Sequence, residues 1–334
     1  MKELTTTTRA GAGVAPAGEG HEITRTERSA SPPARSGRTI AVYGATGYTG
    51  TMVARELVRR GVEVVLAGRS RDALAALAAS FPSSARIAVA ALDDPAALRA
   101  ALSGCDAVVN AAGPFSRSTR PVLAAALAKH CHYLDVSADP YVLRDVFAEA
   151  DQPGRNAGIA IVPGISFFFV LSDLLAQVVS EQATDRLTSV DVGYALERWH
   201  FTPGSMAAFW DMVGQRLRFF DGALRDTTDR PRHGRFAFAS PIGDRAVVEY
   251  PGGDVVTIPR HVATPRVSVS MTAATFAPRW LSWALPVLMS LLGGLSRSRF
   301  RRSLQAIAER VPRRQIEERR AATRFAVRGP RAGG

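Results

Sequence analysis

Short apolar runs alternate with amphipathic helical stretches from residue 38 to about residue 162. Runs that are apolar at every position are typical of strands buried on both faces, and intervening helices indicate parallel pairing. The expected strands are residues 39–43, 62–67, 87–92, 107–111, 133–136 and 159–162, and the expected helices are 49–60, 72–79, 95–102, 120–130 and 141–150. The pattern predicts an α/β fold with a doubly wound parallel sheet, which binds ligands at the carboxyl ends of its strands.

Residues 166–296 follow a different pattern, in which short alternating strands surround one amphipathic stretch. The expected strands are 187–194, 236–238, 246–250, 255–258 and 267–272, with a hairpin turn at 251–254 and a helix at 204–217. This predicts a second, smaller mixed α/β substrate domain with an antiparallel sheet, packed beside the first domain of residues 38–165. The cleft between the two domains is the expected active site.

The glycine spacing after the first strand predicts a nucleotide site. Gly44 allows a sharp turn, Gly47 leaves room for a phosphate beside the backbone, and Gly50 allows the helix to pack on the sheet. The free N–H groups of that helix then face a pyrophosphate. After a strand and before a helix, this spacing indicates a Rossmann dinucleotide site. The residues expected to contact the cofactor here are Gly44, Thr46, Gly47, Tyr48, Thr49 and Gly50.

The end of the second strand favours NADP(H) over NAD. An NAD enzyme usually carries a carboxylate there for the ribose hydroxyls, whereas this chain has Arg69 and Ser70, which suit a 2′-phosphate. Asp93, after the third strand, is expected to border the adenine. The small segment after the fourth strand is expected to pass beside the ribose and nicotinamide, and it consists of Asn110, Ala111, Ala112, Gly113 and Pro114.

Five motifs in order, GATGYTG, AGRS, NAAGPF, HYLDVSAD and GIAIVPG…LSDLLA, give the chain a family resemblance. They resemble the saccharopine dehydrogenase-like NADP-binding proteins, a group that includes saccharopine reductases and trans-acting enoyl reductases, over roughly residues 38–175. The resemblance implies an NADP-dependent oxidoreductase. Residues 167–169 are three phenylalanines where relatives tend to be polar, which indicates either an apolar substrate or core packing.

Short-chain dehydrogenase chemistry is excluded, because its Tyr-x-x-x-Lys motif needs a tyrosine four residues before a lysine. The lysines are Lys2 and Lys129, and Ala125 stands four residues before the second. We expect hydride transfer from NADPH to a polarised double bond, preferably C=C, of an apolar or acyl-linked substrate. The candidate proton or hydrogen-bond donors are His200, Tyr194 and Ser137. An imine or saccharopine-type reductase and a non-catalytic NADP-binding regulator remain alternatives.

Charge and composition add hypotheses about partners. The net charge is +12, and residues 297–334 hold twelve arginines and three glutamates, which predicts a basic helical tail for an anionic membrane surface or an acidic acyl carrier protein. Residues 280–295 are apolar but shorter than a span of ~20 residues, so they fit a substrate lid, a core or homodimer contact, or peripheral membrane contact. No nucleic-acid module stands out.

Two further features bear on location and metals. Residues 1–37 lack apolar periodicity and the core of a signal peptide, which predicts a disordered tail on a cytoplasmic protein. Cys105 and Cys131 lie outside any zinc-like spacing, so we expect reduced thiols and no metal site.

Overall fold

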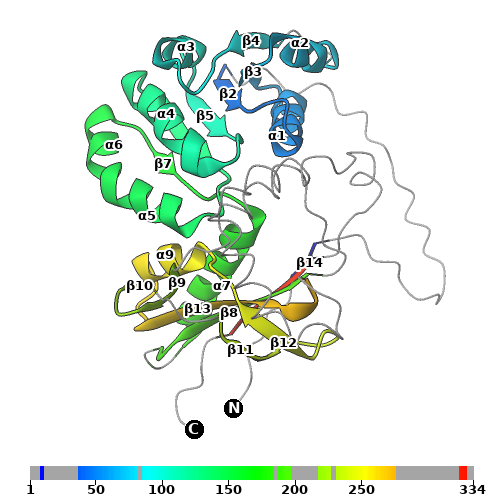
Figure 1. The fold of residues 1–334 in the computed structure, drawn as a ribbon, viewed down its shortest axis with the longest axis vertical. Helices are drawn as coiled ribbons and strands as arrows, with labels where there is room; N and C mark the ends of the chain where they lie inside the picture. The colour runs from blue at the N-terminus through cyan, green and yellow to red at the C-terminus, as the bar shows by residue number, and fades with distance from the viewer. Residues whose placement is uncertain are drawn as a thin grey trace, which may run out of the picture.

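The structure is a computed structural model, and it describes residues 8–10, 37–81, 85–183, 185, 187–196, 217–226, 231–275 and 323–328. Two sheets occupy opposite halves of Figure 1, with the first sheet above the second. Within the described residues, no helix is both long enough and apolar enough to cross a membrane. His200, the predicted helix at 204–217 and the apolar segment 280–295 lie outside the described residues, apart from Leu217.

The first sheet has six parallel strands in the order β4-β3-β2-β5-β6-β7. This order is that of a Rossmann fold, in which the chain leaves the sheet centre in two directions, so the predicted fold class is confirmed. The strands are β2 (Thr39–Tyr43), β3 (Glu63–Gly68), β4 (Arg86–Val89), β5 (Ala107–Asn110), β6 (His132–Asp135) and β7 (Ile161–Val162). The helices are α1 (Tyr48–Arg59), α2 (Arg71–Ala79), α3 (Pro95–Ala101), α4 (Phe115–Ala128), α5 (Pro140–Glu149) and α6 (Asp151–Ala157).

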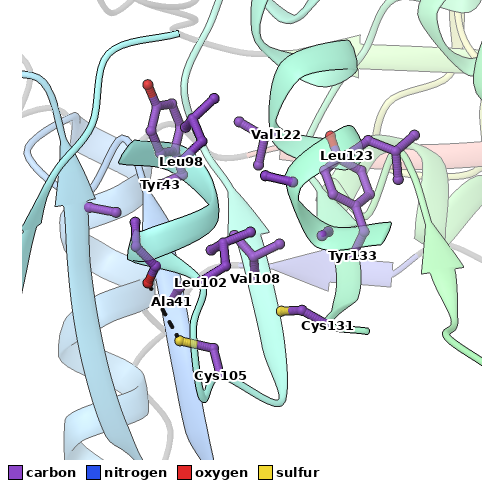
Figure 2. Packing of buried hydrophobic residues seen from close by; sticks show 14 of the residues in the cluster. Ala41, Tyr43, Leu98, Leu102, Cys105, Val108, Val122, Leu123, Cys131 and Tyr133 are labelled. Carbon is purple, nitrogen blue, oxygen red and sulfur yellow. Dashed lines mark hydrogen bonds between the residues drawn. The ribbon is translucent and has the colours of Figure 1, made fainter. Parts of the chain in front are cut away.

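The central strands β2 and β3 are buried on both faces along most of their length. In β2, Ala41 and Tyr43 face one core with α3 and α4, whereas Val42 faces the other core with α1 and α2. Figure 2 shows the first of these cores, where Tyr133 from β6 lies beside side chains of α4. Because both sides exclude water, an uninterrupted apolar run is stable here and an alternating run would not be.

The second sheet is mixed, whereas the sequence predicted an antiparallel one. Its path is β1-β14-β8-β13-β12-β11, and β9 pairs with β13 while β10 pairs with β9. The parallel pair is β8 with β13, and the other pairs are antiparallel. The strands are β8 (Val190–Leu196), β9 (Leu217–Asp221), β10 (Leu224–Asp226), β11 (His233–Ala237), β12 (Asp244–Glu249) and β13 (Arg266–Thr272). Alternate residues of β8 and β13 face the core of the second sheet. This is the arrangement expected for strands in which apolar and polar positions alternate.

Strands at both chain ends differ from two predictions at those residues, and most of each predicted tail lies outside the described residues. β1 (Thr8–Ala10) lies within the expected disordered tail, and β14 (Thr323–Arg328) lies within the expected helical tail. β14 pairs with β8, and β1 pairs with β14. The TRFAVR segment alternates in the way a strand does, but the arginine-rich composition around it obscures that signal.

The predicted strand at 255–258 is also wrong, because the segment forms α9 (Asp254–Thr257) followed by η1 (Ile258–Arg260). Val255, Ile258 and Val262 are almost completely buried. Their spacing of three and four residues is that of a helix face, so packing overrides the β propensity of the valines.

Helices α5 and α7 join the two halves. α7 (Phe167–Gln182) was not predicted; it follows β7 and lies between the two sheets in Figure 1. Leu143 of α5 is buried in the core of the second sheet, and Phe147 of α5 lies 4.1 Å under the Arg260 guanidinium. The second sheet is therefore docked against the nucleotide-binding half by specific packing.

Candidate functional site: the carboxyl edge of the parallel sheet

The turn between β2 and α1 is formed by close backbone contacts. Gly44 has a φ of +80°, and a Cβ there would lie 2.8 Å from the Ala112 nitrogen. A Cβ on Gly50 would lie 2.2 Å from the Gly44 carbonyl oxygen, and one on Gly47 would lie 3.2 Å from the same oxygen. Larger residues would therefore push α1 away from the turn.

The first turn of α1 has the properties of an anion site. Gly47 is its N-cap, no side chain caps the helix, and the first turn holds no acidic residue. The N–H groups of Tyr48, Thr49 and Gly50 have no partner within the helix, and the helix dipole adds positive potential. Tyr48 and Thr49 are exposed, and Thr46 is half-buried beside them. The cradle fits the pyrophosphate of a dinucleotide.

The end of β3 brings together the residues predicted for the 2′-phosphate and the adenine. Arg69 and Ser70 are exposed there, and the Ser70 hydroxyl caps α2 by accepting the Ala73 N–H at 3.4 Å. Burial raises the pKa of Tyr43, whose phenol lies close enough to Arg69 and Asp93 to feel both charges. A capping hydroxyl can still donate one hydrogen bond, so Arg69 and Ser70 both fit a phosphate.

Asn110 differs from its predicted role as a cofactor contact. Its side chain is fully buried and is used within the protein, because it donates to Ser118 and to Tyr133, each at 3.1 Å, and accepts the Ala112 N–H at 3.1 Å. Asn110 therefore shapes the segment from Ala111 to Pro114, which begins at the carboxyl end of β5, next to β2. That position is the switch point where the chain order reverses and dinucleotides bind.

The structure describes two of the three predicted proton donors, Tyr194 and Ser137, and both are buried. Tyr194 is 1% exposed and lies in the core of the second sheet, so it has no open face toward a substrate in this structure. Ser137 is fully buried just after β6, and its hydroxyl has no hydrogen-bond partner within the described residues. His200 lies outside those residues.

A buried acid, which the sequence analysis did not single out, explains the position of Tyr194. The Tyr194 hydroxyl donates to Asp254 Oδ1 at 2.7 Å, and the Ser172 hydroxyl from α7 donates to the same oxygen. Burial raises the pKa of Asp254 to about 6, while the bonds from Ser172 and Tyr194 oppose that rise. Asp254 is fully buried. The only sequence signal was an acid between glycines and a valine run, which resembled a turn.

A second polar cluster lies on the outer part of α7. His261 Nε2 is 2.9 Å from Asp173 Oδ2, and His261 Nδ1 is 2.8 Å from Gln177 Oε1. His261 joins η1 to α7, so it supports the docking of the second sheet. Across the residues that the structure describes, no group of three His, Cys, Asp or Glu side chains could hold a metal ion.

Comparison with known proteins agrees with this geometry. Residues 40–162 match the model of the saccharopine dehydrogenase NADP binding domain. A Mycobacterium tuberculosis protein provisionally named a trans-acting enoyl reductase is 28% identical over 183 residues, which cover 52% of this chain and 44% of that protein. The trans-acting enoyl reductase of Mycobacterium ulcerans is 28% identical over 212 residues, covering 57% and 50%.

A human saccharopine dehydrogenase-like oxidoreductase is 26% identical over 169 residues, which cover 46% of this chain and 39% of that protein. Each match thus spans half or less of the relative's own length. The matched region includes the glycine turn, Arg69 and the segment after β5. Residues 40–162 therefore resemble the saccharopine dehydrogenase NADP binding domain, which agrees with the resemblance seen in the motifs and with NADP(H) as the cofactor.

Proposed function

We propose that the chain is an NADPH-dependent reductase that acts on a polarised double bond, preferably C=C, of an apolar or acyl-linked substrate. The observation that carries this proposal is the NADP-binding domain, whose carboxyl edge continues directly into α7 and a second, docked domain. The enoyl reductase names of the bacterial relatives support the choice of C=C. The name of the human relative, saccharopine dehydrogenase-like oxidoreductase, favours a C=N bond as the second candidate.

The chain's own residues have three tasks in this reaction. The first turn of α1 and Arg69 bind the phosphates, and the segment from Ala111 to Pro114 orients the reactive end of the cofactor. When bound, the cofactor supplies the hydride. Reduction of a conjugated C=C bond leaves negative charge on the acyl oxygen, which needs a hydrogen-bond donor and then a proton at carbon. Ser137 is a candidate donor because its buried hydroxyl lacks a partner within the described residues, and His200 remains a candidate from the sequence.

The test measures NADPH oxidation by the purified full chain with two acceptors. One is a long-chain trans-2-enoyl thioester of coenzyme A, and the other is a preformed imine of an amino acid and a keto acid. Oxidation with the thioester, together with the saturated product, is the expected result. Oxidation with the imine alone would favour the second candidate, and tight NADPH binding without oxidation by either would favour the regulator.

Partner hypotheses remain proposals that the same preparation can test. Acyl carrier protein as the carrier of the substrate predicts faster turnover of the carrier-bound thioester than of the coenzyme A thioester. The apolar segment 280–295 and the basic residues 297–322 predict flotation with anionic vesicles, and size-exclusion chromatography with light scattering tests the homodimer. A cytoplasmic, peripheral location is the proposal that accompanies these partners.

A further inference from the structure

A chain of buried hydrogen bonds runs across the carboxyl ends of β5, β6 and β7. Asn110 accepts the Ala112 N–H and donates to the Tyr133 hydroxyl, each at 3.1 Å. The Tyr133 hydroxyl donates to Asp135 Oδ2 at 2.9 Å. Asp135 Oδ1 accepts the Gly164 N–H at 2.8 Å, so one continuous chain joins the segment after β5 to the segment after β7.

The hydrogen-bond chain is buried from solvent, and its continuity depends on the Tyr133 hydroxyl. Asn110, Tyr133 and Asp135 are fully buried. Burial, with the charge of Asp135 as a second cause, raises the pKa of Tyr133, so the phenol stays protonated and remains a donor. Since the Tyr133 oxygen both accepts and donates, its removal would leave Asn110 and Asp135 each without a partner that they use here.

One end of the chain lies in the cofactor site. Ala112 packs so closely on Gly44 that a Cβ on Gly44 would lie 2.9 Å from the Ala112 Cα. The segment from Ala111 to Pro114 is thus held by the glycine turn on one side and by Asn110 on the other.

The other end of the chain holds the connector between the domains, residues 163–166. Asp135 fastens this connector twice, because its carboxylate accepts the Gly164 N–H and its carbonyl oxygen accepts the Ile165 N–H at 2.7 Å. The connector continues into α7. In that helix the Ser172 hydroxyl donates to Asp254, and the Asp173 carboxylate lies beside the His261 ring. A movement of Asp135 would therefore be passed to the second domain.

We propose that Tyr133 and Asp135 are positioning residues that couple the cofactor segment 111–114 to the connector 163–166. Cofactor bound against the first segment then stabilises the second, and the start of α7 is set for the substrate only when the cofactor is in place. This inference rests on the proposed function only through NADPH binding and does not depend on the substrate. Coupling of this kind is reciprocal, so a disturbed connector must also weaken NADPH binding.

The experiment compares amide hydrogen exchange of the full chain with and without saturating NADPH. In the wild type, we expect the Gly164 and Ile165 amides to exchange about fivefold or more slowly with NADPH bound, in line with typical coupling strengths. Tyr133→Phe keeps the ring but breaks the chain. We expect it to bind NADPH roughly tenfold more weakly and to lose the slowing at saturation.

Tyr43→Phe is the matched control, since it also removes a buried phenol hydroxyl of the same sheet, one that donates to the Ala90 carbonyl at 3.1 Å instead. It should keep the slowing at Gly164 and Ile165. Gly164→Ala provides the reciprocal test, because Gly164 has a φ of +74° and a Cβ there would lie 2.8 Å from Leu143. It should weaken NADPH binding about fivefold or more, although Gly164 lies outside the cofactor segments.

Three results would overturn the proposal while leaving the reductase function intact. One is slowing that persists in Tyr133→Phe, and another is NADPH binding with no change of exchange at the connector in the wild type. The third is unchanged NADPH affinity in Gly164→Ala. Failure of the wild type to bind NADPH would overturn this inference and the proposed function together. Absence of turnover with normal binding and normal coupling would count against the reductase alone.

Discussion

At the scale of single residues, glycines that leave space for the backbone matter as much as residues with functional side chains. Gly50 shows this most clearly, because the atoms that its Cβ would meet belong to the backbone of Gly44 and Ala45, and backbone cannot rotate away. Arg69 shows the opposite case, an exposed side chain whose value depends on its charge. Each residue leads to a prediction.

Gly50→Ala should destabilise the protein by about 3 kcal/mol, since the new Cβ overlaps the Gly44 carbonyl and forces α1 away from β2. NADPH affinity should fall with it, because the N–H groups of α1 would move. Urea unfolding and calorimetric titration measure the two effects. The control is Gly104→Ala, which has a φ of +72° and no atom within 4 Å; it should cost only about 1 kcal/mol and leave NADPH affinity unchanged.

Arg69→Ala should weaken NADPH binding by roughly 10- to 100-fold, the usual value of a charge-assisted hydrogen bond. NADH affinity should change little, because NADH lacks the 2′-phosphate. Calorimetric titration with both nucleotides measures the ratio. Arg71→Ala, a change at a neighbouring arginine, is the control. Equal losses of NADH and NADPH affinity in Arg69→Ala would contradict the assignment of Arg69 to the 2′-phosphate.

At the scale of elements, α7 and α9 are joined by a buried carboxylate rather than by apolar packing alone. Asp254 begins α9 and accepts hydrogen bonds from Ser172 of α7 and Tyr194 of β8, so three elements meet at one oxygen. A Cβ on Gly252 would lie 2.6 Å from the other carboxylate oxygen, which explains why a glycine precedes this helix. The arrangement makes the second domain sensitive to pH.

The pKa of Asp254 rises from its ordinary value of 3.8 to about 6 in the folded protein. The folded state therefore holds a proton more tightly than the unfolded state, and stability falls as the pH rises through about 6. The difference amounts to about 3 kcal/mol between roughly pH 3 and pH 7. Asp254→Asn, which has no charge to bury, should lose this fall. Urea unfolding of both proteins across that range measures it.

Asp151→Asn is the control of opposite sign for this titration. Asp151 is exposed, and the hydrogen bond from Arg155 at 3.0 Å lowers the pKa of its carboxyl group. Any stability that Asp151 contributes to the fold therefore increases as the pH rises. Parallel stability curves for the wild type and Asp254→Asn would contradict the role given to Asp254.

At the scale of the whole molecule, segments from the two ends of the chain complete the second sheet. β14 lies between β8 and β1, and its residues pair with Asp191–Leu196 of β8 over six positions. β1 pairs with β14 over three positions and forms an edge of the sheet. A chain shortened to residue 279, an obvious variant for testing the apolar segment, would also lose β14.

A proline substitution in β14 and another in β1 test which of the two strands is central to the sheet and which lies at its edge. Ala326→Pro on β14 should cost about 3 kcal/mol, whereas Ala10→Pro on β1 should cost less than about 1 kcal/mol. Thermal unfolding measures both. NADPH affinity should stay within about twofold in each, because in the part of the chain that the structure describes the parallel sheet makes no strand pairs with the second one. Equal destabilisation by the two prolines would contradict the pairing of β14 with β8.

The nucleotide-binding half could be predicted from the sequence because its signals are local. The central strands are short apolar runs, the turn after β2 carries the glycines of the nucleotide site, and the cofactor choice depends on Arg69 directly after β3. The second half could not be predicted in this way. β8 finds its partners more than 70 residues along the chain, α9 carries a valine run typical of a strand, and α7 has an apolar start that resembles core or entrance.

The amino-acid sequence by itself determined the Rossmann domain and its NADP(H) cofactor, and it contains no Tyr-x-x-x-Lys motif, since each of these depends on neighbouring residues or simple spacing. Only the tertiary structure decided that Asn110 faces inward, that Tyr194 is bonded to a buried acid, and that Tyr133 and Asp135 link the cofactor segment to the connector. The physical reason is that hydrogen bonds between buried side chains depend on which strands become neighbours, and strand order follows from packing of the whole chain.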